Sequence, residues 1–101
     1  SRGAWYNRSM LKVEGNKFMR DGEKVGWIDG AQIFDKEGRN VGYIEDENVF
    51  SRNGKRLGYV HDDYLHMENG DKMELDQLKE YIQGGQVPTL VRAAACILLG
   101  D

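Results

Sequence analysis

Glycine recurs every 16 residues through the middle of the chain, at Gly22, Gly38, Gly54 and Gly70. Each glycine stands in one of four similar stretches, which read NKFMRDGEKVGWID, QIFDKEGRNVGYIE, NVFSRNGKRLGYVH and YLHMENGDKMELD. A fixed period of this kind indicates one structural unit repeated along the chain. Because each unit places β-branched and aromatic residues on both sides of a turn dipeptide, we predict that each unit is a β-hairpin.

The turn dipeptides predict how the strands pair. Two-residue type I′ turns favour Asn-Gly and Asp-Gly because both central residues need positive φ. Such turns are predicted at Asp21-Gly22, Asn53-Gly54 and Asn69-Gly70, with Glu37-Gly38 a weaker version. A turn at Asp21-Gly22 pairs Phe18 with Val25, which places Phe18 on the same sheet face as Trp27.

The opposite face of the predicted sheet places an aliphatic residue across from a glycine. Ile33 is expected across from Gly42 and Val49 across from Gly58, and in the last unit Leu65 across from Glu74. A second set of turns, near residues 14–16, 30–31, 46–47 and 62–63, joins one hairpin to the next. The sequence therefore predicts a meander of about eight short strands that closes into a shallow barrel, since closure removes exposed edges.

Helical signals replace the period after residue 76. Asp76 is predicted to cap a short helix that Gly84-Gly85 stops, and Pro88 to lie in the first turn of a second helix that Gly100 ends. This second helix, TLVRAAACILL, is apolar nearly all round apart from Arg92, so it must be buried. We expect it to pack on or in the barrel, where Gly26, Gly42 and Gly58 permit close approach; a membrane-inserted or partner-docked tail is the alternative.

Three segments follow from these patterns. Residues 1–9 are either a cloning remnant, with Met10 as the natural start, or an arm that docks through Trp5 and Tyr6. Residues 10–76 form the hairpin barrel, beginning with a half-unit strand at 10–14. Residues 77–101 form the helical segment, whose helices are too short to cross a bilayer, which takes about 20 residues. The protein is therefore not expected to be transmembrane.

The spacing of Phe, Gly and Gly-aromatic positions resembles that of the bacterial four-fold β-flower proteins. The resemblance covers residues 10–99 and rests mainly on Phe18, Gly22, Gly26 and Trp27 with their equivalents 16 and 32 residues later. It implies a shallow, petal-like β-barrel and supplies no function. The fourth unit departs, with His66 in place of Phe and Glu74 in place of Gly. A looser similarity is to tubby-like barrels, which enclose a hydrophobic helix and include phosphoinositide binders.

Catalytic chemistry is poorly supported. His61, Asp62, Asp63 and His66 are clustered in sequence, but strand alternation separates the two histidines, and a transition metal usually needs three or four convergent ligands. We expect His61 to be exposed at a strand end and His66 to occupy a Phe position. Cys96 lies among apolar residues, where a thiol acts as a small hydrophobic group. The sequence thus predicts a non-enzymatic protein with no catalytic residues, metal or cofactor.

A binding module is the function that the sequence favours. Trp27, Tyr43 and Tyr59 recur once per unit and, with Lys24 and Arg56, form a candidate face for an apolar or lipid-like ligand; packing in the core is the simpler alternative for these rings. A structural protein that forms homo-oligomers through this face or through the C-terminal helix is the second candidate, and protein partners are compatible with both. The net charge of −3, with acids and bases interleaved, argues against nucleic acid. A single cysteine and no visible signal peptide favour the cytoplasm, with membrane-peripheral attachment as the variant.

Overall fold

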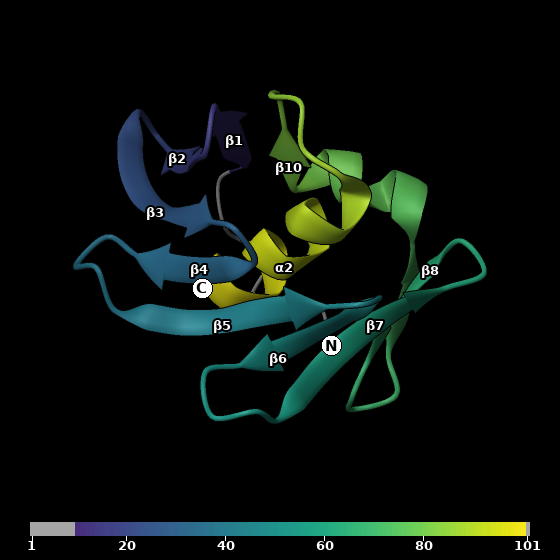
Figure 1. Cartoon of the computed structure of the whole chain (residues 1–101). Helices are drawn as coiled ribbons and strands as arrows, with labels where there is room; N and C mark the ends of the chain where they lie inside the picture. Colours follow the sequence, from purple (N-terminus) through teal and green to yellow (C-terminus); the bar gives the residue numbers. More distant parts are fainter. Residues whose placement is uncertain (1–9, 101) are drawn as a thin grey trace.

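Ten strands form one sheet, in the order β10-β1-β2-β3-β4-β5-β6-β7-β8-β9, in the computed structural model, which describes residues 10–100 (Figure 1). The strands are β1 (Leu11–Glu14), β2 (Lys17–Arg20), β3 (Glu23–Asp29), β4 (Gln32–Asp35), β5 (Asn40–Glu45), β6 (Asn48–Ser51), β7 (Arg56–His61), β8 (Tyr64–Met67), β9 (Lys72–Glu74) and β10 (Ile82–Gln83). A 3-10 helix, η1 (Leu75–Glu80), and an α-helix, α2 (Thr89–Leu99), complete the chain. The fold is mainly β with a C-terminal helix, and residues 1–9, including Trp5 and Tyr6, lie outside the described part.

The sheet is curved but open, so the predicted closure into a barrel is wrong. β9 and β10 are its two edges, and within residues 10–100 the one parallel pair joins β10 to β1 at the far end from β9. The chain leaves β9 and forms η1 before it reaches β10 (Figure 1). Because six residues of η1 take the place of a strand at this point, the ring of strands is interrupted there rather than hydrogen-bonded throughout.

Two kinds of turn alternate along the meander. Two-residue turns join β1 to β2, β3 to β4, β5 to β6 and β7 to β8, with Asp46, Asp62 and Asp63 adopting positive φ in the last two. The turn at Asp21-Gly22 also has two residues, with φ of 53° and 82°, as predicted. The remaining hairpins have three-residue loops instead, in which the Gly38 N–H donates to Asp35 O at 2.9 Å and the Asp35 N–H to Arg39 O at 2.9 Å. Only the glycine of such a loop needs positive φ.

A register shift in the first hairpin overturns the predicted face of Phe18. Its partner across the hairpin is Gly26, not Val25, because the register shifts between Phe18 and Met19. Phe18 is completely buried and is equivalent to Ile33, which lies across from Gly42 as predicted. The first loop is one residue shorter than the others, and the equal spacing of the loop glycines conceals that difference. In the last unit the register also differs from the prediction, since Leu65 lies across from Met73 rather than Glu74.

Helix α2 fills the concave side of the sheet (Figure 1). A methyl group added at Gly26 would lie 2.7 Å from Leu99 Cδ1, one at Gly42 would lie 2.8 Å from Leu98 Cδ1, and one at Gly58 would lie 3.2 Å from Ile97 Cδ1. The predicted close approach of the helix to these glycines is therefore confirmed. Consecutive helical residues point about 100° apart. Three successive side chains that reach three hairpins therefore require the sheet to turn through about 200° around the helix.

The core between sheet and helix is made of small residues on one side and aliphatic or aromatic residues on the other. Ala93, Ala94 and Ala95 of α2 are fully buried, as are the inward-facing residues of β2, β4, β6 and β8, which are Phe18, Ile33, Val49 and Leu65. Alanine side chains let the helix backbone approach the sheet closely. The concave side is therefore occupied by the chain's own helix.

Both ends of α2 are fixed by contacts from elsewhere. Pro88 precedes its first turn rather than lying in it, and Gly100 follows its last residue. The Arg20 guanidinium of β2 donates to the carbonyl oxygens of Leu99 and Gly100, each at 3.4 Å. A cation at the C-terminal end of a helix satisfies orphan carbonyls and complements the helix dipole. β2 and the last turn of α2 are thereby tied together.

The shorter helix differs from the prediction. η1 begins after Glu74, whose N–H donates to Gln77 Oε1 at 3.0 Å, so Asp76 lies inside the first turn and is not the cap. Ile82 leaves the helix and pairs with Leu11 in the parallel β10–β1 ladder. Gly84 and Gly85, with φ of 84° and 70°, then turn the chain toward α2. The predicted stop of the helix at this glycine pair is wrong, because η1 ends at Glu80 and β10 separates it from the glycines.

Candidate functional site

Three pairs of stacked rings lie on the outer face of the sheet, the face that points away from α2. The pairs are Trp27 with Phe34 (centroids 5.6 Å apart, rings at 17°), Tyr43 with Phe50 (5.1 Å, 19°) and Tyr59 with His66 (4.7 Å, 9°). We call these six residues the aromatic ladder. All six side chains are half-buried, so each leaves part of a ring exposed.

The two-residue turns produce the ladder. A turn at Gly30-Ala31 pairs Asp29 with Gln32, which places Trp27 directly across from Phe34. Side chains alternate along a strand, so Gly26 faces the helix while Trp27 faces outward. Each pair therefore forms between hairpins, across β3–β4, β5–β6 and β7–β8, and not within the units that the glycine period marks.

Cations cover two of the three pairs. The Lys24 Nζ lies 4.6 Å from the centroid of the Trp27 ring, and the Arg56 Cζ lies 4.4 Å from that of Tyr59. Residues three apart in a regular strand point to opposite faces. The register shift in β3 places one extra residue in that strand, which brings Lys24 to the face of Trp27. Cations above aromatic faces are attracted by the ring quadrupole.

The two cations differ in their other contacts. Arg56 Nε donates to Glu68 Oε2 at 3.0 Å, so its charge is balanced within the same hairpin. Lys24 is exposed, and none of the ion pairs found within residues 10–100 includes it. The middle pair has Asn40 at the equivalent position, where its amide nitrogen donates to Gln32. The outer face therefore carries an exposed lysine at each end: Lys24 beside Trp27, and Lys72, whose Nζ lies 4.5 Å from the Tyr64 ring next to His66.

The structure brings the predicted ligand-face residues together in part. Trp27, Tyr43 and Tyr59 share the outer face with Lys24 and Arg56, each in its own hairpin. Sequence reasoning missed the cross-strand stacking partners, Phe34, Phe50 and His66, because it paired residues around the glycine turns. Counting outward from the turns at 30–31, 46–47 and 62–63 finds all three partners.

The histidines adopt the predicted positions. His66 stacks on Tyr59 as Phe50 does on Tyr43. His61 Nε2 lies 3.2 Å from Asp62 Oδ2, and its side chain is 68% exposed. Within residues 10–100, no group of three His, Cys, Asp or Glu side chains is arranged to hold a metal ion. The ring centroids of His61 and His66 are 6.4 Å apart and their planes are tilted by 46°.

Cys96 is placed for packing and not for nucleophilic attack. It is 2% exposed and belongs to the hydrophobic core. Burial raises the pKa of the thiol from 9.0 to about 12, although Arg20 and Arg92 act in the opposite direction. Since the thiolate is the reactive form, this cysteine is unreactive in the folded protein.

A sheet wrapped around its own C-terminal helix, with glycines at the contacts and aromatic residues outside, defines a small β-repeat protein with a filled interior. The family model for the 4-fold beta flower protein matches residues 16–76, which is more than half of the chain. The chain belongs to this family. No curated protein and no solved structure matches it. No helix within residues 10–100 is long and apolar enough to cross a membrane.

Proposed function

We propose that this chain is a small non-enzymatic binding module that holds a lipid-like anionic amphiphile on the aromatic ladder. The observation that carries the proposal is the pairing of half-exposed rings with cations on the outer face. Because α2 covers the concave face of β4 to β7, a ligand reaches these strands from the outer face. We therefore place the amphiphile on that face.

The chemistry at the Lys24 and Trp27 end of the ladder fits a ligand with an anionic head group next to an apolar chain. Lys24 supplies an exposed charge, and Trp27 supplies the largest ring of the ladder. Trp side chains favour membrane interfaces, where one edge of the ring is apolar and the other is wet. A Lys near an anionic lipid surface contributes about 1 kcal/mol, so one such site gives weak, reversible attachment.

Vesicle binding tests the proposal. A Trp5→Phe variant leaves Trp27 as the only tryptophan, and its emission should shift to the blue with phosphatidylcholine vesicles that contain phosphatidylglycerol, but not with phosphatidylcholine alone. Lys24→Glu should weaken binding by roughly tenfold or more, since each unit of charge contributes about 1 kcal/mol. Lys36→Glu makes the same charge change at an exposed hairpin tip and serves as the control.

Two results contradict the proposal: equal binding of the Lys24→Glu and Lys36→Glu variants, or no shift with either vesicle. Added salt should weaken the interaction, because exposed charges are screened. Native mass spectrometry of gently purified protein gives a second readout. A bound lipid mass that is lost in Trp27→Ser supports the ladder as the site.

A homo-oligomer formed through the ladder is the second candidate. Its support is the Arg56–Glu68 ion pair beside the rings, which gives one surface both charge signs and so allows it to complement a second copy of itself. Sedimentation velocity over a wide concentration range tests it. A mass that doubles with concentration in the unaltered chain, and stays monomeric in Tyr43→Ser, favours this candidate over lipid binding.

A further inference from the structure

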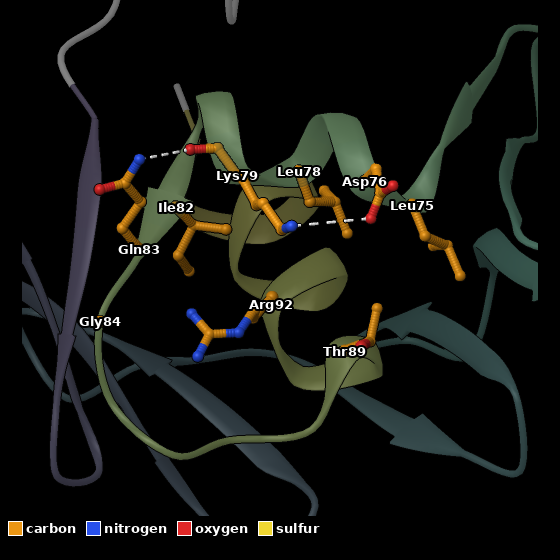
Figure 2. Close-up of a pocket in the computed structure, with 9 residues that line it drawn as sticks. All are labelled: Leu75, Asp76, Leu78, Lys79, Ile82, Gln83, Gly84, Thr89 and Arg92. Carbon is orange, nitrogen blue, oxygen red and sulfur yellow. Dashed lines mark hydrogen bonds and ion pairs between the residues drawn. The ribbon is translucent and has the colours of Figure 1, made fainter.

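The interruption of the sheet between β9 and β10 contains a cavity that the aromatic ladder does not reach. Its volume is about 470 Å³, and it is lined by η1, β10 with the loop that follows, and the first turns of α2, with one side open to solvent (Figure 2). Small-molecule sites in proteins typically measure about 300–1,000 Å³. The cavity is therefore large enough for a small organic molecule.

One side of the cavity is apolar and fixed in place. Leu75 is half-buried and presents apolar surface to the cavity, whereas Leu78 and Ile82, at 2% and 1% exposed, form a closely packed floor beneath it. Backbone hydrogen bonds hold this wall: the Leu75 N–H donates to Asp63 O at 2.9 Å, and the Tyr81 N–H donates to Leu78 O at 2.9 Å. Ile82 is further held by pairing with β1. A ligand meets this wall already formed.

The other side carries one cation, Arg92, which has more N–H donors than the one that it uses for Gly85. Arg92 extends from α2 across the opening toward Ile82 and Gly84 (Figure 2). Its guanidinium donates one N–H to Gly85 O, at a long 3.3 Å. A guanidinium has five N–H donors, and no ion pair joins Arg92 to a carboxylate within the described residues. A planar fork of this kind matches a carboxylate in bidentate geometry.

The remaining charges at the rim offset each other. Lys79 Nζ lies 3.8 Å from Asp76 Oδ1, and both side chains are mostly exposed. The net charge that the cavity offers is therefore the single charge of Arg92. One guanidinium neutralises one carboxylate, whereas a phosphate dianion would need a second cation.

We infer that this cavity binds a small monocarboxylate with a short apolar body. The carboxylate lies on the Arg92 guanidinium, and the apolar body lies against Leu75, above the buried floor of Leu78 and Ile82. The site is separate from the aromatic ladder and stands whether or not the ladder binds lipid.

Amide chemical-shift mapping of the full chain with three eight-carbon probes tests the inference. Octanoate, below its micelle-forming concentration, should saturably shift amides within residues 75–92. Octanol should bind at least tenfold more weakly, and octylamine should leave these amides unmoved. Arg92→Gln should lose at least tenfold in octanoate affinity. Arg39→Gln is the matched control, because Arg39 is 68% exposed on a distant hairpin loop, and it should bind like the unaltered chain.

Other outcomes overturn the inference. These are equal affinity for octanol and octanoate, shifts confined to β3–β8, and unchanged octanoate binding in Arg92→Gln with a normal melting transition. Arg92→Lys keeps the charge and the apolar stem, so it replaces Arg92→Gln if that variant unfolds at the assay temperature. Several-fold weaker binding by Arg92→Lys supports bidentate recognition, and full affinity contradicts it. Trp27→Ser should retain octanoate binding, which separates this site from the ladder.

Discussion

Substituting Gly42 by alanine should destabilise the protein strongly, because α2 and β6 leave no room for a methyl group there. The added Cβ would clash with the Phe50 carbonyl oxygen and lie 2.8 Å and 2.9 Å from the two Cδ atoms of Leu98. Gly42 has no positive φ, so the cost arises from packing and not from backbone strain. Overpacking a filled core typically costs about 1–3 kcal/mol. We expect about 3 kcal/mol, because a carbonyl in a sheet ladder cannot move aside as a side chain can.

Gly58→Ala provides a graded control. Its added Cβ would lie 2.9 Å from the His66 carbonyl oxygen and 3.2 Å from Ile97 Cδ1, a looser fit than at Gly42. A cost of about 1 kcal/mol is expected, at the low end of the overpacking range. For a domain of this size each kcal/mol lowers the melting temperature by about 4–8 °C. Gly42→Ala should therefore melt roughly 12–24 °C lower, and Gly58→Ala about 4–8 °C lower.

Urea denaturation followed by far-UV circular dichroism measures both costs. The double variant Gly42→Ala/Leu98→Ala separates the two clashes, because removing the Leu98 side chain relieves one of them and leaves the carbonyl clash. The double variant should then cost about 0.5–3 kcal/mol less than the sum of the Gly42→Ala and Leu98→Ala costs, as is usual for residues in contact. A Gly42→Ala variant within about 0.5 kcal/mol of the unaltered protein, or a Gly58→Ala variant that is less stable than Gly42→Ala, would refute the packing argument.

Four further perturbations test other contacts. Arg20→Gln removes the donors to the last carbonyls of α2 and should cost about 0.5–1.5 kcal/mol in urea denaturation, with Arg20→Lys costing less. Burial raises the pKa of the Cys96 thiol to about 12, so between pH 9 and 12 the unfolded chain releases a proton that the folded chain keeps. Over this range the free energy of unfolding should fall by about 1.4 kcal/mol for each pH unit. The Cys96→Ala variant should lack this pH dependence. The Arg39 backbone N–H, which donates to Asp35 Oδ1 at 3.0 Å, lowers the pKa of that carboxyl. The Asp35 carboxylate therefore stabilises the fold above its unfolded-state pKa, and this stabilisation is lost as pH falls through its folded-state pKa. The Asp35→Asn variant should lose less stability than the unaltered protein as the pH falls below about 4. Deleting residues 87–101 exposes the concave face and should abolish the cooperative melting transition; a truncated protein with the full-length transition would contradict this.

The glycines explain how much of the fold could be predicted from the sequence. Gly26, Gly42 and Gly58 recur next to aromatic residues, and that pattern alone predicts a strand face that something approaches closely. The apolar sequence around Ala95 predicts a buried helix to make the approach. Both inferences rest on local rules, which are the period of two along a strand and the absence of a polar helix face, and both are confirmed.

The errors arise where one residue changes the register. Gly22 and Gly38 stand 16 residues apart, yet one closes a two-residue turn and the other a three-residue loop. The equal spacing concealed that Phe18 is equivalent to Ile33 and not to Phe34, and the register shift between Phe18 and Met19 turns Phe18 inward. A one-residue slip exchanges the two faces of a strand, and repeat counting cannot detect it. Barrel closure failed for a different reason, since only tertiary packing determines that η1 and not a strand follows β9.

The two candidate sites could also be predicted from the sequence only in part. The rings and cations of the ladder could be identified individually from their recurrence, but the shift that brings Lys24 over Trp27 could not. The cavity beside Arg92 had no sequence signal at all. It exists because the sheet is open, and the sequence predicted a closed one.

The contact of consecutive α2 residues with consecutive hairpins has a consequence for how the helix finds its register. If α2 slipped by one residue, it would turn about 100° and place a new side chain at each glycine. The side chains facing Gly58, Gly42 and Gly26 would then be those of Cys96, Ile97 and Leu98. Two of the three glycines would still face a branched aliphatic side chain, so core packing discriminates only weakly between neighbouring registers of the helix. We therefore expect contacts at the ends of the helix to select its register: Arg20 donates to the last carbonyls, and Arg92 donates to the carbonyl of Gly85.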